Sequence, residues 1–132
     1  MKQETVRHIS VFIDRTATAV YDYASNPENL STWATGLGEP RIIGAEVVAD
    51  SPMGRIKIRI TPRNDFGILD HDVITEAGEV FHNPMRVVPR GSGSEVVFTL
   101  FRQPGTPDEK FLADATWVEK DLNKLKEILE SK

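Results

Sequence analysis

"TPDEKFLADATWVEKDLNKLKEIL", residues 106–129, is the stretch that decides the fold. Its apolar side chains recur at spacings of 4, 3, 4, 3 and 4 residues, as Phe111, Ala115, Val118, Leu122, Leu125 and Leu129. This spacing places them on one face of an α-helix. Thr106, Pro107 and Glu109 match a capping box, which predicts where the helix begins. The stretch therefore predicts one long amphipathic helix that runs almost to the last residue.

The residues before this helix follow a different period. Alternation of apolar and polar residues predicts strands over residues 6–13, 41–50, 55–61, 66–75, 79–89 and 95–102. Residues 17–24 and 26–33 instead have helical spacing and predict two short helices after the first strand. Short connections make the later strands antiparallel neighbours. We therefore predict an α+β fold in which a curved antiparallel sheet of about six strands wraps the long C-terminal helix.

The overall composition excludes several classes of protein. The 132 residues fit one domain, residues 1–132, and the net charge of −4 disfavours a nucleic-acid partner or an anionic membrane partner. Cysteine is absent, which excludes disulfides and thiolate chemistry. The N-terminus lacks the apolar run of a signal peptide, and no stretch approaches a membrane-spanning length. We expect a cytoplasmic protein without a cofactor.

The segment "AVYDYASNPENLSTW", residues 19–33, has an apolar stripe, an Asn-Pro-Glu sequence and then a tryptophan. With the element order of the whole chain, it resembles the START-related helix-grip superfamily, also called the polyketide cyclase/dehydrase (SRPBCC) or birch-pollen-allergen-like superfamily. The resemblance implies a cavity between the sheet and the long helix. Its members include lipid and hormone binders, polyketide cyclases, oxygenase subunits and chaperone-ATPase activators. The resemblance therefore predicts the fold and transfers no catalytic residue.

The segment "LDHDVITEAGEVFHNPMRV", residues 69–87, predicts a β-hairpin with unusual polar residues. A two-residue loop at Ala77 and Gly78 sets the register of this prediction. It places Val73 opposite His82 and Leu69 opposite Arg86. A change of register by one residue would exchange the two faces of the hairpin.

In this register His71, His82 and Arg86 share one face, while Ile74, Phe81 and Met85 share the other. Two interpretations stay open, because periodicity does not choose which face is inside. In the first, the polar face lines the cavity. The two histidines could then act as acid and base, and Arg86 could hold a carboxylate or an enolate. In the second, the polar face is solvated.

Other candidate residues have simpler interpretations. Trp33 and Trp117 are predicted to line the ligand site, although aromatic residues on apolar stripes usually belong to the core. We expect no metal site, because Asp72 points away from His71 and His82 in the predicted register. The candidate ligand-binding residues are Trp33, His71, His82, Arg86 and Trp117, and no catalytic residue is assigned.

The size of the expected cavity follows from its energetic cost. An empty void of roughly 300 Å³ would cost about 7 kcal/mol, similar to the stability of a small domain. Such a space must hold a ligand or water, or collapse. We therefore predict the binding of a small hydrophobic molecule. The alternatives are a cyclase or dehydratase that uses His71 or His82, and a protein-interaction module. Whether the protein forms a homodimer stays open.

Overall fold

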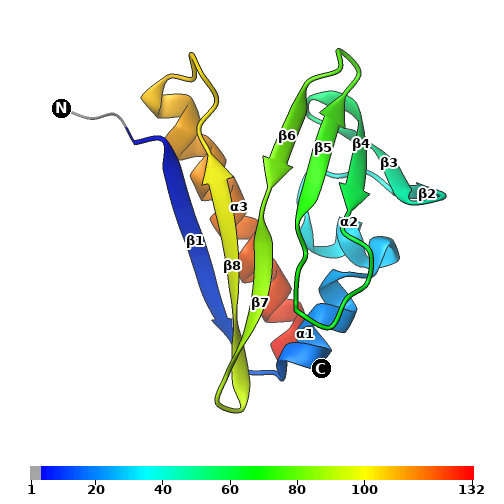
Figure 1. Cartoon of the computed structure of the whole chain (residues 1–132), viewed down its shortest axis with the longest axis vertical. Helices are drawn as coiled ribbons and strands as arrows, with labels where there is room; N and C mark the ends of the chain where they lie inside the picture. Colours follow the sequence, from blue (N-terminus) through cyan, green and yellow to red (C-terminus); the bar gives the residue numbers. More distant parts are fainter. Residues whose placement is uncertain (1–3) are drawn as a thin grey trace.

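A computed structural model describes residues 4–132 and shows an α+β fold (Figure 1). The strands are β1 (Val6–Ile13), β2 (Arg41–Ile43), β3 (Glu46–Ser51), β4 (Gly54–Ile60), β5 (His71–Thr75), β6 (Val80–Asn83), β7 (Met85–Arg90) and β8 (Gly93–Phe101). The helices are α1 (Ala17–Ala24), a 3₁₀ turn η1 (Pro27–Asn29), α2 (Leu30–Trp33) and α3 (Asp108–Glu130). The predicted helix-grip arrangement is confirmed, with α3 packed against β1 and β8.

The strands form two antiparallel sheets, with the orders β1-β8-β7 and β2-β3-β4-β5-β6. The sequence predicts β6 and β7 as one strand, but the structure divides them at Pro84. Proline has no N–H group to donate to a strand ladder, which explains the break. Backbone hydrogen bonds from Leu69 to Met85 and from Val87 to Gly67 continue the pairing beyond it. Figure 1 shows the two sheets diverging on either side of this junction.

The predicted long helix is confirmed as α3. Phe111, Ala115, Leu122, Leu125 and Leu129 are buried and Val118 is partly buried. The helix lies closest to β1, β8 and α2. Each fully buried leucine contributes roughly 1.5–3 kcal/mol through the removal of apolar surface from water. The stripe therefore attaches α3 firmly to the three-stranded sheet.

The predicted capping box at the start of α3 is wrong. Pro107 occupies the capping position, and no side chain caps the helix. The carbonyl oxygen of Thr106 instead accepts hydrogen bonds from the guanidinium group of Arg102, at 2.6 and 3.0 Å. This contact fixes the connection from β8, so that Asp108 becomes the first residue of the helix.

The two predicted short helices are present as α1 and α2, joined by the η1 turn. Thr16 caps α1 by accepting a hydrogen bond from the backbone N–H of Ala19. Asn26 caps the η1 turn in the same way through Glu28. Asparagine and threonine favour such positions because their side-chain oxygens satisfy otherwise unpaired N–H groups. The buried side chains of these helices are Val20, Tyr21, Ala24, Leu30 and Trp33.

Candidate functional site

The hairpin of β5 and β6 has a register different from the predicted one. Asp72 lies opposite His82 and Val73 lies opposite Phe81. The reason is the turn, which contains three residues, because Thr75 and not Glu76 pairs with Glu79. Its last residue is Gly78 with φ of +88°, a conformation that glycine adopts readily. One additional turn residue exchanges the faces of the second strand, so the predicted grouping is wrong.

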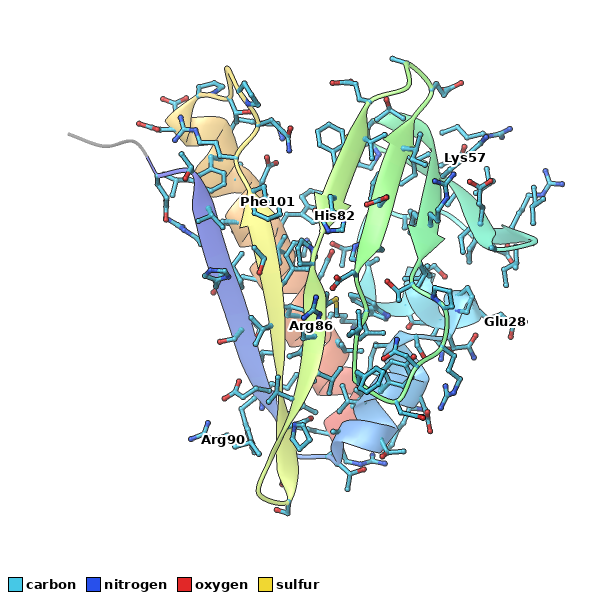
Figure 2. The ribbon with its side chains drawn as sticks, viewed as in Figure 1. Glu28, Lys57, His82, Arg86, Arg90 and Phe101 are labelled. Atoms are coloured by element: carbon cyan, nitrogen blue, oxygen red, sulfur yellow. The ribbon has the colours of Figure 1, made fainter. Side chains whose placement is uncertain are left out.

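His71 therefore lies on the inner face of the sheet, whereas His82 and Arg86 lie on the outer face. Figure 2 shows His82 and Arg86 on the side of β6 and β7 away from α3. His82 contacts Asp72 at 2.7 Å, between its Nδ1 and a carboxylate oxygen. Arg86 donates hydrogen bonds to both carboxylate oxygens of Asp70, at 3.0 and 2.8 Å. Each outer residue thus has an acidic partner at the surface.

The ion pair of Arg86 and Asp70 shifts the pKa of each group in the direction that favours its charged form. The hydrogen bond from Arg86 lowers the pKa of Asp70, and the same bond raises the pKa of Arg86. The two directions agree, as expected for a bidentate contact. Arg86 is therefore committed to Asp70 and does not reach the inner face.

His71 has a defined tautomer. Its Nδ1 lies 3.0 Å from the carbonyl oxygen of Leu69. Because a carbonyl oxygen can only accept, Nδ1 carries the hydrogen and Nε2 presents a lone pair. Burial lowers the pKa of His71, which favours this neutral ring. The ring of His71 forms a T-shaped contact with the ring of Phe98, with ring centroids 5.9 Å apart. His71 therefore offers a hydrogen-bond acceptor on the inner face.

The inner face is covered unevenly by α3. Inner residues of the three-stranded sheet, including Val87, Val96 and Phe98, are buried. The inner residues of β5 and β6 are His71, Val73, Thr75, Phe81 and Asn83, and all of them remain partly exposed. The helix lies nearest to β1 and β8, which explains the difference. The inner face of β5 and β6 is thus less buried than the inner face of the three-stranded sheet.

Trp33 lies in the core at the end of α2, with 7% of its surface exposed. Its Nε1 is buried and has no hydrogen-bond acceptor within residues 4–132. A buried donor without an acceptor typically costs 1–3 kcal/mol of folding free energy. Trp33 belongs to the apolar core, and its role in lining a ligand site stays a prediction.

Trp117 lies at the edge of α3, with 45% of its surface exposed. Its Nε1 donates a hydrogen bond to the carbonyl oxygen of Thr35, at 3.2 Å. One turn further along the helix, a carboxylate oxygen of Asp121 accepts hydrogen bonds from the backbone N–H and the hydroxyl group of Thr35, at 3.0 and 2.6 Å. Burial raises the pKa of Asp121. Helix α3 thus holds Thr35 at three points.

Residues 34–40, which we call the strap, connect α3 to the five-stranded sheet. Gly36 has φ of +85°, and a Cβ atom there would lie 2.8 Å from the ring of Trp117 and 3.5 Å from Pro52. The backbone N–H of Gly38 donates to the carbonyl oxygen of Asp50, at 2.8 Å. The strap therefore spans from the helix to the turn between β3 and β4.

Thr35 and Asp121 were missed in the sequence analysis. They are 86 residues apart, so no local pattern connects them. The available signal was the position of Asp121 directly beside Leu122 on the apolar stripe, where a carboxylate needs a hydrogen-bond donor.

Residues 4–132 contain neither a cluster of potential metal ligands nor a helix that could span a membrane. In the described part of the chain, His, Asp and Glu side chains do not gather in a group of three that could hold a metal ion. His71 and His82 also point to opposite faces, so one ion cannot bind both. Within residues 4–132, no helix is both long enough and apolar enough to span a membrane.

Comparisons with known proteins give the fold. No protein-family model and no curated protein matches the sequence. An uncharacterized protein from Bacillus thuringiensis has a similar structure, with a TM-score of 0.77 and 16% identity over 94% of this chain and 98% of its own. Ara h 8.0201 has a TM-score of 0.71 and 10% identity over 96% and 98% of the two chains.

A third solved structure is DynU16, a protein of the dynemicin biosynthetic locus. It has a TM-score of 0.75 and 15% identity, and the match covers 98% of this chain but 48% of DynU16. This chain thus spans about half the length of DynU16. Identities this low show a shared fold and do not transfer a function. The chain is an α+β protein of the helix-grip fold.

Proposed function

We propose that the protein binds a small apolar molecule between α3 and the inner face of β5 and β6. The observation that supports this most directly is the environment of His71. Its pKa is lowered by surrounding protein, yet its side chain keeps exposed surface. Both properties are expected for a side chain that lines a narrow space inside a protein.

The neighbours of His71 extend this surface. Val73 and Phe81 lie opposite each other on the inner face and are also partly exposed. A ligand that covers such partly exposed apolar side chains gains about 25 cal/mol of binding free energy for each Å² of apolar surface that it removes from water. The strap crosses from α3 to the turn between β3 and β4. We infer that a ligand passes the strap to enter, with Trp117 and Trp33 on the helical side.

A fluorescence titration with N-phenyl-1-naphthylamine tests this proposal, because this uncharged dye becomes bright in apolar surroundings. Val73→Trp fills the inner face, whereas Ile74→Trp places the same side chain on the outer face of the same strand. We expect saturable binding by the wild type and by Ile74→Trp, and none by Val73→Trp. Circular dichroism checks that each variant is folded, and Phe81→Trp replaces Val73→Trp if it is not. A folded inner-face variant that binds the dye as the wild type does would refute the proposal.

A second candidate function is catalysis, and one observation favours it. Neutral His71 has an unshared lone pair on Nε2 in a desolvated position, which is the state needed by a general base. His82 does not qualify, because it lies on the outer face with Asp72. If the protein is a cyclase or dehydratase that uses His71 as its base, His71→Phe should still bind the dye but should lose catalytic turnover of the substrate. Loss of dye binding and turnover together would leave only a binding role for His71.

A further inference from the structure

The chemical class of the ligand can be inferred from the charges around the proposed site, and this step rests on the proposed function. The side chains that face inward from β5 and β6 are His71, Val73, Thr75, Phe81 and Asn83. Those from β4 are three isoleucines. Every arginine and lysine of β4 and β7 points to the outer face, as does each acidic residue of β5. The inner face of these strands is therefore polar in places and carries no cation.

Two arginines on the inner side of β1 and β8 are already engaged. Arg7 and Arg102 lie over the ring of Phe111, at 5.8 and 5.4 Å from its centroid. Arg7 pairs with Glu4 and Arg102 pairs with Asp108, both at 2.7 Å. A buried carboxylate needs a cation or several donors, and neither arginine is free to supply one. An anionic ligand would thus lose its hydration without a free cation of these strands to pair with.

Among the polar groups of the inner face, the ring of His71 offers a hydrogen-bond acceptor. Nδ1 of His71 is committed to Leu69, and no residue in the described chain donates a hydrogen bond to Nε2 of His71. We propose that the ligand is an uncharged alcohol or phenol whose hydroxyl group donates a hydrogen bond to Nε2 of His71. Burial opposes a second proton on the ring, so His71 does not become the cation that a carboxylate would need.

Three ligands of similar shape separate the possible outcomes. Each of 2-naphthol, 2-methylnaphthalene and 2-naphthoate competes with N-phenyl-1-naphthylamine at neutral pH. We expect 2-naphthol to bind about tenfold more tightly than 2-methylnaphthalene, because it supplies one hydrogen bond to a buried acceptor. We expect 2-naphthoate to bind at least about a hundredfold more weakly than 2-naphthol, because its charge is buried without a partner.

Two variants assign the preference to one histidine. In His71→Phe the advantage of 2-naphthol over 2-methylnaphthalene should disappear, whereas His82→Phe on the outer face should keep it. If the wild type binds 2-naphthoate as tightly as 2-naphthol or more tightly, the inference is overturned while the proposed function stands. This measurement uses the wild type alone, so it does not depend on the folding of any variant. An unchanged preference in folded His71→Phe would overturn it as well. If the dye and all three compounds fail to bind, the proposed function and this inference both fail.

Discussion

The contact between the strap and α3 allows a quantitative prediction for Asp121. In Asp121→Ala, the backbone N–H and the hydroxyl group of Thr35 lose their common acceptor. Hydrogen bonds to a charged group contribute about 1.5–3 kcal/mol each. The raised pKa of Asp121 shows that burial of the ionised carboxylate offsets part of this gain. We therefore expect a net loss of about 2 kcal/mol in the free energy of unfolding.

Urea unfolding followed by circular dichroism measures this loss. With a slope of about 2 kcal/mol per M, the midpoint should fall by about 1 M. Asp121→Asn is the matched control, because its amide oxygen can still accept both hydrogen bonds, and it should lose less than half as much. A midpoint of Asp121→Ala within about 0.2 M of the wild type would show that the three-point attachment of Thr35 does not stabilise the fold.

The titration of Asp121 has a defined sign. Its pKa in the folded state lies above the ordinary value of 3.8, so the folded protein takes up this proton first as the pH falls. The contribution of Asp121 to the free energy of unfolding therefore rises as the pH falls through the folded pKa toward 3.8. Asp121→Asn lacks this contribution, and the difference between the two pH curves isolates it.

Three further predictions concern the core and the two faces of the sheet. Leu125→Ala should cost about 3 kcal/mol of unfolding free energy, because this side chain is fully buried, whereas Leu112→Ala at a position 50% exposed should cost less than about 1 kcal/mol in the same urea assay. Burial lowers the pKa of His71 from 6.5, so the wild type should lose stability as the pH falls from 6.5 to the folded pKa, and thermal unfolding of His71→Phe should show a flatter curve there. The pKa of Asp70 is lowered from 3.8 by Arg86, so the wild type should lose the stability of this pair as the pH falls below 3.8, and Arg86→Met should show a smaller loss in that range. A wild-type curve that is flat in either pH range would contradict the corresponding assignment.

Helix α3 was predictable because its stripe repeats six times within one continuous segment. A polar residue at any one of these six positions would still leave a helical pattern, so the prediction of a helix does not depend on a single residue. The structure confirms the buried face from Phe111 to Leu129. The start of the helix was less predictable. The capping-box pattern at Thr106 competes with a contact from Arg102, which comes from outside the helix and has no periodic signal.

The candidate site was predictable only in part, because its chemistry depends on which face a side chain occupies. Strand periodicity identified β5 and β6 and their polar residues. The length of the turn then decided whether His82 joins His71, and a turn ending in Gly78 is compatible with two or three residues. The sequence thus located the right hairpin, while the faces of its two histidines required the three-dimensional register.

The interruption at Pro84 has a mechanical consequence. The two sheets are joined by the covalent chain at Pro84, by backbone hydrogen bonds around Leu69 and by the ion pair of Arg86 and Asp70, and the ladder is not continuous across them. A small rotation of the backbone near Pro84 would change the angle between the sheets without breaking the ladder of either one. A ligand bound as proposed would then widen or narrow the space beside α3 according to its thickness. Selectivity among ligands would then depend mainly on complementary polar groups and much less on a fixed shape of the binding space.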